Sequence, residues 1–380
     1  MKVALVHDYL REYGGAERVL EVLHEIFPEA PLYTAYYNKK ALGSKGETFR
    51  GWDIRTSWIQ HLPFANKLIS PLRIFAPNIF ESFNLSEYDL VISSSSAVYF
   101  AKSVITKPQT LHISYIHTPP RFLYGYVTSF NYKKHFITRI VGEIMNHYLR
   151  IVDFEVSQRP DILVANSKNI QDRIKKFYRR DSIVIYPPVG IDKYPPIVGK
   201  MSRKYFLTVG RLVRGKGVDV IIEACGKLGF PLKVVGTGPE LENYKSEITN
   251  NKNVQFLGSV SDEELIKLYS GAKATILASG DEDFGIVPVE SQAAGTPVIA
   301  PASGGYLETI IDGKTGILFK GDSGKVTVDS LMEGIKQFSG IKFKTKDCRA
   351  NARKFSKERF KKEILELIKK NFKKGLDKTL

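Results

Sequence analysis

The sequence contains few cysteines and no long apolar run. Cys225 and Cys348 are the only two cysteines in 380 residues, which is too few for a disulfide framework or a four-ligand metal site. No stretch approaches the roughly eighteen apolar residues that a membrane-spanning helix needs, and Met1–Val6 is too short to begin a signal peptide. We therefore expect a cytoplasmic protein, which leaves association with the inner face of the membrane open.

Internal repeats and low-complexity tracts are also missing, and this excludes a solenoid and a disordered chain. Hydrophobic residues make up 43% of the chain and charged residues 25%, which is a globular composition. A chain of 380 residues fits two domains of ordinary size better than one.

Acidic residues are in the minority, and the formal net charge is +16. The segment 341–380 holds fifteen Lys and Arg against five Asp and Glu, so it carries +10 of this charge. A basic tail can bind nucleic acid or an anionic membrane, or it can be a solvated helix face with no partner. We expect no nucleic-acid partner, because such a partner favours basic and aromatic residues interleaved on one surface, whereas this charge sits on a terminal amphipathic helix.

Short apolar runs alternate with helical patterns along the whole chain. The first series of expected strands is Val3–His7, Asp89–Ser93, Leu111–Ile116, Asp161–Ala165 and Ile183–Tyr186. The second series is Tyr205–Val209, Leu232–Val235, Val254–Leu257, Ala274–Leu277 and Pro297–Ala300. Helices are expected at Ala16–Phe27, Val218–Leu228, Asp262–Ser270 and Pro288–Ala294. The alternation predicts an α/β protein with two doubly wound, Rossmann-like domains.

Two proline pairs mark the boundary between the domains. Pro187-Pro188 and Pro195-Pro196 fix the backbone and lack N–H donors, so they indicate a stiff linker. We place the first domain at residues 1–186 and the second at 187–355. All seven histidines precede the linker, so any histidine chemistry belongs to the first domain. A helix at about 356–374, with an apolar stripe from Phe360 to Phe372, ends the chain and must pack on another element.

The segment Glu282–Glu290 carries the strongest functional signal. It follows an expected strand, and Pro288 suits the first turn of a helix. The backbone N–H groups of 284–287 would then lie at a helix N-terminus, where anions and hydroxyl-rich ligands bind. Glu282 and Glu290 bracket this position, and carboxylates accept hydrogen bonds from pairs of sugar or ribose hydroxyls. Alternatively, both acids only favour the helix N-terminus electrostatically.

Glycine-containing turns follow the first strand of each series. The turn Gly210–Gly217 contains Arg211 and Lys216, which are suited to phosphate oxygens, but it lacks the spacing of a P-loop. The turn Gly14–Arg18 allows a diphosphate to approach a helix N-terminus. It is not the dinucleotide fingerprint, so a nicotinamide enzyme loses support. Each turn taken alone fits an ordinary tight turn equally well.

His117 directly follows the expected strand Leu111–Ile116, at the carboxyl end that faces a ligand cleft in parallel sheets. A neutral imidazole there can hydrogen-bond a sugar hydroxyl or assist the proton transfer of an acceptor. A single histidine is also commonly structural. His112, on the same strand, is expected to pack in the core.

In combination, these motifs resemble glycosyltransferase family four, whose members have the GT-B fold. The resemblance runs from His7 to about Phe319 and rests on the E-x7-E spacing of Glu282–Glu290, the Gly210–Gly217 turn, Gly236-Thr237-Gly238-Pro239, Phe256-Leu257-Gly258 and Ser303-Gly304-Gly305. The stretches His7-Asp8-Tyr9 and His112–Tyr124 look most like the mannosyltransferases of bacterial and archaeal surface-polysaccharide assembly. The resemblance implies two domains facing across a cleft, with the final helix packed back on the first domain.

The resemblance also implies roles for residues of the second domain. Arg211 and Lys216 correspond to the residues that neutralise the donor diphosphate, and Glu290 to the acid that binds the ribose hydroxyls. Glu282 corresponds to the acid beside the donor sugar. The backbone of the block formed by Phe284, Gly285, Ile286 and Val287 holds the sugar hydroxyls and the phosphate, and Val260 lies where the base is held.

In the first domain, Gly15 corresponds to backbone beside the phosphates and His117 to the histidine on the other side of the sugar. The implied activity is a retaining transfer of a hexose, with mannose favoured, from a nucleotide-sugar to a glycan or lipid-linked acceptor. Loss of the diphosphate builds charge that fixed Arg, Lys and N–H donors stabilise without a metal. No cofactor is expected beyond the donor itself, for which GDP-mannose is favoured.

Three alternatives remain at this point. A UDP-sugar in place of GDP-mannose fits the same motifs. Another chemistry on the GT-B fold, such as sugar-nucleotide epimerisation or phosphorolysis, is the second alternative. A phosphorylase should carry a lysine that binds pyridoxal phosphate, and nothing in the sequence marks such a lysine. A non-catalytic nucleic-acid-binding protein would explain the basic tail but not the E-x7-E segment.

Overall fold

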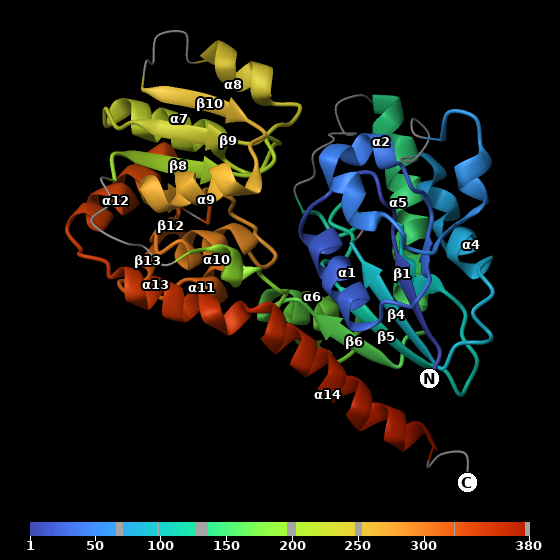
Figure 1. The fold of residues 1–380 in the computed structure, drawn as a ribbon. Coiled ribbons are helices and arrows are strands. Elements are labelled where there is room, and N and C mark those ends of the chain that lie inside the picture. The colour runs from blue at the N-terminus through green and yellow to red at the C-terminus, as the bar shows by residue number, and fades with distance from the viewer. Residues whose placement is uncertain are drawn as a thin grey trace. The chain divides into compact units, whose positions relative to one another are not determined.

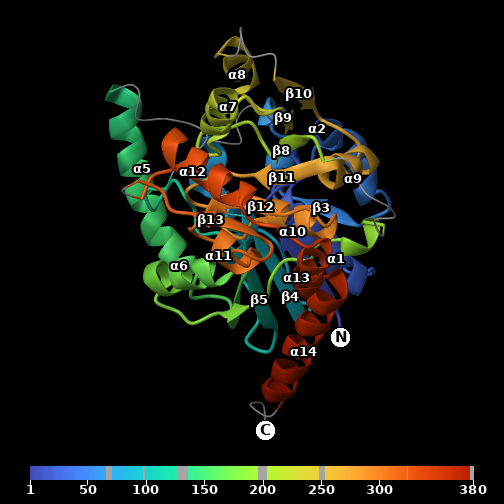
Figure 2. The ribbon, with the colours of Figure 1, turned by 90° about the vertical axis from the view of Figure 1, so that its left-hand side faces the viewer.

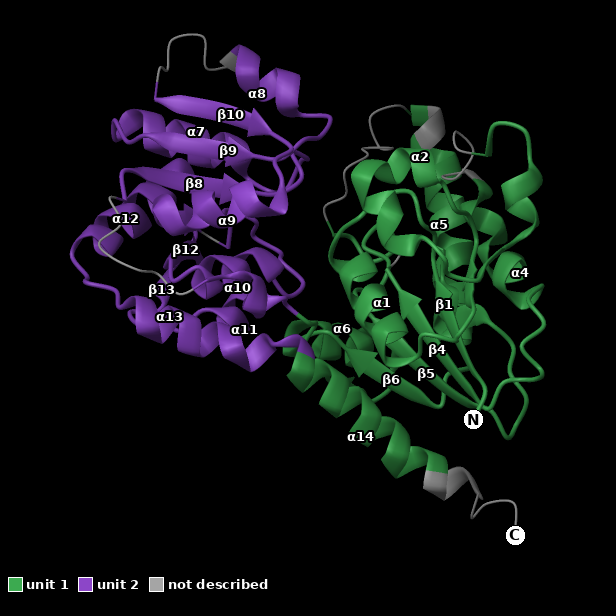
Figure 3. Ribbon diagram, in the orientation of Figure 1, with its two compact units in different colours: residues 1–126, 130–188, 358–380 green, residues 127–129, 189–357 purple. Residues whose placement is uncertain are grey.

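Two sheets of parallel strands form the framework of the chain (Figure 1). The computed structural model describes residues 1–65, 71–96, 99–126, 136–195, 203–247, 253–322 and 324–376. Within these ranges, the residues up to Pro188 and those from Glu358 onwards form unit 1, and those of Val189–Lys357 form unit 2 (Figure 3). The chain passes from unit 1 to unit 2 two residues beyond Tyr186, where the sequence places the boundary.

Unit 1 contains a seven-stranded sheet in the order β3-β2-β1-β4-β5-β6-β7, and its described strand pairs are parallel. Its strands are β1 (Val3–His7), β2 (Leu32–Thr34), β3 (Ile54–Thr56), β4 (Leu90–Ser95), β5 (Leu111–Ile116), β6 (Ile162–Ala165) and β7 (Ile183–Val184). Its helices are α1 (Gly15–Ile26), α2 (Lys39–Leu42), α4 (Ala76–Glu81), α5 (Phe136–Val156), α6 (Lys168–Tyr178) and α14 (Lys357–Leu376). The strand order reverses once, between β1 and β4.

The two faces of this sheet carry different cores. Successive strand residues point to opposite faces, so Ala4 and Val6 of β1 enter one core and Leu5 enters the other. Buried residues of α4 and α5 complete the first core, and those of α1 and α14 complete the second. Helices α5 and α14 therefore cover opposite faces of the sheet of unit 1.

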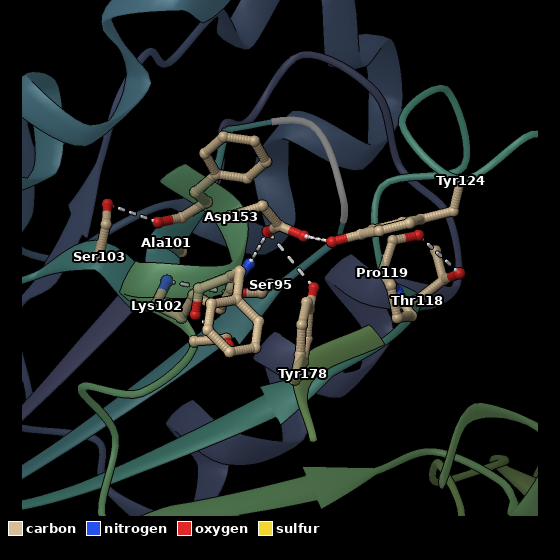
Figure 4. A network of polar contacts seen from close by, with 12 residues as sticks. Ser95, Ala101, Lys102, Ser103, Thr118, Pro119, Tyr124, Asp153 and Tyr178 are labelled. Carbon is tan, nitrogen blue, oxygen red and sulfur yellow. Dashed lines mark hydrogen bonds and ion pairs between the residues drawn. The ribbon is translucent and has the colours of Figure 1, made fainter. Parts of the chain in front are cut away.

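A buried ion pair holds α5 in place (Figure 4). Lys102, in the short 3-10 helix Ala101–Ser103, lies 2.5 Å from Asp153 of α5, and both side chains are almost fully buried. The Asp153 carboxylate also accepts hydrogen bonds from Tyr124 at 2.8 Å and Tyr178 at 3.3 Å. Since a buried charge is tolerated only with such partners, this network fixes which face of α5 points inward.

Helix α14 returns the end of the chain to unit 1. Phe360 and Ile364, together with Leu367 and Ile368, are buried in the core formed with α1 and the sheet. The ring of Phe360 meets that of Tyr115 on β5 at a centroid distance of 5.9 Å. Leu365 on the other side of α14 is 47% exposed.

Unit 2 contains a six-stranded sheet in the order β10-β9-β8-β11-β12-β13, with the strand pairs of its described residues again parallel. Its strands are β8 (Tyr205–Val209), β9 (Leu232–Val235), β10 (Val254–Gly258), β11 (Ala272–Ile276), β12 (Val298–Pro301) and β13 (Gly316–Phe319). Its helices are α7 (Val218–Lys227), α8 (Leu241–Glu247), α9 (Asp262–Gly271), α10 (Ile286–Ala293), α11 (Tyr306–Thr309), α12 (Val328–Ser339) and α13 (Thr345–Ala352). The order reverses between β8 and β11.

The expected α/β alternation is confirmed, and the structure adds elements that were not expected, among them the 21-residue helix α5. Strands β2, β3 and β13 were not expected. Helix α10 begins at Ile286, two residues before the expected start at Pro288. Part of the linker, from Pro196 onwards, lies outside the described residues.

Within the described ranges, no helix is both long enough and apolar enough to cross a membrane. Cys225 and Cys348 are free thiols, and both are buried. Burial raises the pKa of each thiol to about 12.

We expect the packing of α14 to contribute strongly to the stability of unit 1. Phe360→Ala removes a fully buried ring and should lower the free energy of unfolding by about 3–5 kcal/mol. Leu365→Ala, on the exposed side of the same helix, should change it by less than about 0.5 kcal/mol. Urea denaturation followed by circular dichroism measures both, and equal effects would contradict the observed packing.

Candidate active site

The candidate residues lie where the strand order of each sheet reverses. In parallel sheets, ligands bind at the carboxyl ends of the two strands that flank such a reversal. In unit 2 these strands are β8, followed by Lys216, and β11, followed by Glu282. In unit 1 they are β1, which ends in His7, and β4, which contains Ser94. Each unit thus presents one group of polar residues at its reversal.

In unit 2, the reversal brings the basic turn and the acidic segment together. The Nζ atom of Lys216 lies 2.7 Å from Oε2 of Glu282, and Tyr306 donates a hydrogen bond to the same oxygen at 3.3 Å. The side chains of Lys216 and Glu282 remain 40% and 19% exposed, so this charged pair is open to a ligand. The sequence-based expectation that these two segments face each other agrees with this contact.

Close backbone contacts hold the two segments at this distance. A Cβ atom on Gly217, which has φ +66°, would lie 2.6 Å from the carbonyl oxygen of Ala278, so only glycine lets the basic turn approach the chain after β11. A Cβ atom on Gly304 would lie 2.4 Å from the carbonyl oxygen of Glu282. Gly305 also donates its N–H to that oxygen at 2.8 Å. The glycines of both turns therefore position the side chains of Lys216 and Glu282.

Helix α10 carries the second acid of the spaced pair. Glu290 is 6% exposed, and its Oε2 accepts a hydrogen bond from Tyr269 of α9 at 3.0 Å. Val260 and Val287 pack against the small core that contains Tyr269. The residue expected to bind the ribose (Glu290) and the segment expected to hold the base (around Val260) are thus parts of one packed region of unit 2.

The N-terminus of α10 follows the loop that contains Glu282. Gly285 precedes the helix with φ +89°, and Phe284 is buried, with its ring 5.4 Å from that of Phe355. In an α-helix the N–H groups point toward the N-terminus. Those of the first turn, at Ile286 and Val287, have no acceptor within the helix and can therefore bind a ligand. Arg211, in the turn after β8, is exposed.

In unit 1, three hydrogen bonds link side chains from adjacent elements. Nε2 of His7 lies 3.4 Å from Oε1 of Glu17 on α1, and Nδ1 of His7 lies 3.1 Å from Oγ of Ser94. The same Oγ lies 2.9 Å from Nε2 of His117. Glu17 is fixed in turn, because the N–H of Gly14 donates to its Oε2 at 2.7 Å. The four side chains form one continuous chain that ends at His117.

This chain of hydrogen bonds ends at a buried imidazole. His117 is 9% exposed. Burial, and to a smaller extent the charge of the nearby His7, lower the pKa of His117 to about 3, so the ring stays neutral at physiological pH.

Gly15 is the first residue of α1, at the same edge of the sheet as His117. Asp8, directly after β1, is fully buried and accepts backbone hydrogen bonds from Ser96 at 2.9 Å and Ala101 at 2.8 Å. The loop after β4 is thereby tied to the end of β1. His112 is fully buried and hydrogen-bonds Ser93 at 3.0 Å, which places it in the core.

The structure groups the expected residues within each unit. Arg211, Lys216, Val260, the Glu282–Val287 segment and Glu290 belong to unit 2, and Gly15 and His117 belong to unit 1. The sequence interpretation missed the contribution of Glu17, Ser94, Tyr269 and Tyr306. The signal for two of them was available, since Ser94 lies near the end of a strand, as His7 does, and Glu17 stands three residues after Gly14 at a helix start.

Across the described ranges, no group of three or more His, Cys, Asp or Glu side chains lies close enough together to hold a metal ion. The charges at the reversal in unit 2 instead come from Lys216, Arg211 and two carboxylates. This arrangement suits a ligand with both anionic and hydroxyl groups.

Comparison with known proteins links this geometry to one family. Residues 190–355 match the family model described as Glycosyl transferases group 1. This range coincides with unit 2 to within two residues. The D-inositol 3-phosphate glycosyltransferase of Corynebacterium urealyticum is 27% identical over 250 residues, a match that covers 58% of this chain and 59% of that protein. The chain thus spans less than two thirds of the length of this relative.

Solved structures resemble the chain over nearly its whole length. The Anabaena protein Alr3699/HepE, solved with UDP and glucose, matches 97% of this chain and 99% of its own with a TM-score of 0.67 and 19% identity. The sucrose-phosphate synthase of Thermosynechococcus elongatus matches 98% of this chain and 99% of its own with a TM-score of 0.70 and 16% identity. These likenesses confirm the expected GT-B fold of two Rossmann-like domains. That the domains face each other across a cleft stays a prediction.

The neutral state of His117 and His112 predicts how stability depends on pH. Both pKa values fall from 6.5 in the unfolded chain to about 3 in the fold, chiefly through burial. Between these values only the unfolded chain binds the protons, so stability is fully present above about pH 6.5 and falls as the pH decreases. His117→Gln should reduce this slope by about 1.4 kcal/mol per pH unit in the range of pH 6 to 4.

Urea denaturation at several pH values measures the free energy of unfolding of the wild type and of His117→Gln. His147→Gln, which replaces an exposed histidine, should leave the slope unchanged. An unchanged slope in His117→Gln would contradict the buried, neutral state.

Proposed function

We propose that this protein is a retaining glycosyltransferase that moves a hexose from a nucleotide-sugar to a glycan or lipid-linked acceptor. The observation that carries the proposal is the Lys216–Glu282 contact of 2.7 Å at the strand reversal of unit 2. It joins a phosphate-binding cation to a hydroxyl-binding acid, within the range that matches Glycosyl transferases group 1. A nucleotide-sugar contains both of the groups that such a pair recognises.

The donor diphosphate is the leaving group in this reaction. When its bond to the anomeric carbon breaks, negative charge develops on the phosphate oxygens and the sugar becomes oxocarbenium-like. Lys216 and Arg211, with the N–H groups at the start of α10, stabilise that charge because they are held in position before the reaction. The acceptor oxygen forms the new bond on the face that the diphosphate leaves, and the acceptor proton departs with the diphosphate.

The acids have separate roles. Glu282 and the backbone of Phe284 and Gly285 hold the hydroxyls of the transferred sugar. Glu290 binds the ribose hydroxyls, and its hydrogen bond to Tyr269 fixes the carboxylate for that purpose. The nucleotide base lies near Val260.

His117 and Gly15 are the residues of unit 1 that the resemblance assigns to the donor. Because the pKa of His117 lies near 3, the imidazole is a weak base at neutral pH. This favours a hydrogen bond between His117 and a sugar hydroxyl over removal of the acceptor proton. The backbone at Gly15, at the N-terminus of α1, is suited to the phosphates.

GDP-mannose is the donor that we favour, because the segment His112–Tyr124 resembles mannosyltransferases of surface-polysaccharide assembly. A UDP-sugar is the alternative, supported by the Anabaena protein that was solved with UDP and glucose. The ribose clamp at Glu290 serves either nucleotide. The choice of base therefore depends on the residues near Val260 and the loop Gly236–Pro239.

The basic turn gives the sharpest test of the activity. Arg211→Ala and Lys216→Ala should each lower the rate of sugar transfer by about 10²–10³, since each removes a group that meets the charge of the leaving diphosphate. Arg214→Ala is the matched control, because Arg214 lies in the same turn but pairs with Glu240 at 3.8 Å. Rates are measured with excess EDTA present. Loss of activity in EDTA with rescue by manganese would contradict transition-state stabilisation by these residues alone.

Calorimetry with GDP and UDP tests the roles of the two acids and the identity of the base. Glu290→Ala should weaken nucleotide binding, whereas Glu282→Ala should lower turnover far more than nucleotide affinity. Tyr269→Phe, which removes the bond to Glu290 but keeps the carboxylate, should have an intermediate effect on binding. If UDP binds at least about tenfold more tightly than GDP, a difference of about 1.4 kcal/mol, the GDP-mannose assignment is wrong and the glycosyltransferase assignment stands.

A further inference from the structure

Helix α5 exposes an apolar face along its whole length. Figure 2 shows α5 as a single long helix, and it comprises 21 residues, or about 31 Å. Seven of its large apolar side chains are between 41% and 77% exposed: Phe136, Ile140, Val141, Ile144, Tyr148, Ile151 and Phe154. At the rotation of an α-helix they occupy an arc of about 140°. The polar residues within this arc are His147 and Glu155.

This exposed face is distinct from the face that α5 buries. Leu149, Val152 and Val156 on the other side enter the core of unit 1. Asp153 is held there by Lys102, Tyr124 and Tyr178 (Figure 4). Rotating α5 to bury the apolar arc would pull a buried carboxylate from its cation, which strongly destabilises a fold. The apolar face therefore stays outside the core.

Three further exposed aromatic residues are sequence neighbours of residues in the core that α5 completes. Trp58, Phe64 and Phe75 are between 43% and 71% exposed. Each adjoins a residue of the core that also contains Leu149 and Val152 of α5, namely Ile59, Ala65 and Ala76. Among the described side chains of unit 1, half of the exposed large apolar residues belong to α5, whereas Leu365 is the one such residue of α14, on the opposite face.

The charge of unit 1 indicates what covers this face. Residues 1–188 and 358–380 contain 32 Lys and Arg against 21 Asp and Glu, a net charge of +11. On α5, Arg139 and Arg150 lie outside the apolar arc together with Glu143, and Lys133-Lys134-His135 immediately precede the helix in the sequence. An anionic surface complements this charge, whereas unit 1 of a second copy carries the same +11 and is repelled. An amphipathic helix with an apolar face and cationic surroundings is the form that binds the interface of an anionic bilayer.

We propose that the apolar face of α5, formed by the seven side chains named above, inserts into the headgroup region of an anionic lipid bilayer. This goes beyond the proposed glycosyl transfer and does not depend on it. It also places the lipid contact on the face of the sheet opposite to α14, so a flat bilayer that meets α5 does not meet the lysines of the C-terminal helix.

Vesicle binding by single variants tests this proposal. The full chain should co-sediment with vesicles that contain phosphatidylglycerol, less so at high salt, and weakly with vesicles of phosphatidylcholine alone. Ile144 is 67% exposed, and Ile144→Ser should weaken binding about tenfold because one aliphatic side chain no longer leaves water. Leu365→Ser is the matched control on α14 and should leave vesicle affinity unchanged.

A site-specific probe reports the depth of insertion. Because Cys225 and Cys348 are buried, with thiols of raised pKa, an environment-sensitive thiol dye should label a cysteine introduced at an exposed position instead. The emission of the dye in Ile144→Cys should shift to the blue with anionic vesicles, and that in Leu365→Cys should not.

Three results would overturn the proposal. They are no binding by the full chain, equal loss of binding in Ile144→Ser and Leu365→Ser, and a lipid-free dimer that Ile144→Ser converts to a monomer. The last result would assign the face to a second copy. Calorimetry of GDP and UDP with Ile144→Ser separates this question from the proposed activity, because nucleotide affinity should be unchanged whether or not the lipid contact is real.

Discussion

The parallel direction of the strands is the constraint on which both candidate groups of residues depend. Since every described strand of a sheet points the same way, the residues that follow the strands gather at one edge, and a reversal of strand order leaves space there between two loops. In unit 2 this constraint brings Lys216, after β8, to Glu282, after β11, although 66 positions separate them in the sequence. In unit 1 it brings His7 and Ser94, 87 positions apart, into hydrogen-bond contact.

The two units use this edge in chemically different ways. Unit 2 presents opposite charges that remain partly exposed, together with a buried carboxylate fixed by Tyr269. Unit 1 presents a neutral, almost fully buried histidine, whose hydrogen bonds run through Ser94 and His7 to Glu17. A charged group that is open to solvent suits the diphosphate of a donor, and a neutral polar group in a dry position suits hydroxyls. The proposed division between phosphate binding in unit 2 and sugar contact from unit 1 is consistent with this difference.

The buried contacts that shape the core of unit 1 also determine which helix faces lie on its surface. Asp153, satisfied by Lys102 and two tyrosines, sets the rotation of α5 and so leaves its apolar arc outside. Phe360 and its neighbours set the rotation of α14 and leave its lysines outside. Because these helices cover opposite faces of one sheet, unit 1 has an apolar outer face on one side and a cationic outer face on the other.

The sequence by itself determined the α/β class, most strand positions and the residue types at the unit 2 edge. Strands buried on both faces read as continuous apolar runs, and glycine, Arg, Lys and Glu at the ends of those runs are visible in the letters. It did not show β2, β3 or β13. Only the tertiary structure decided that Glu17, Ser94 and His7 connect to His117, since these contacts join separate elements. It alone also decided that the apolar residues of α5 face outward, because the periodicity of a helix is the same whether its apolar side is buried or exposed. The burial of Asp153 with Lys102, a contact between residues that are distant in the sequence, decides that the apolar side of α5 is exposed.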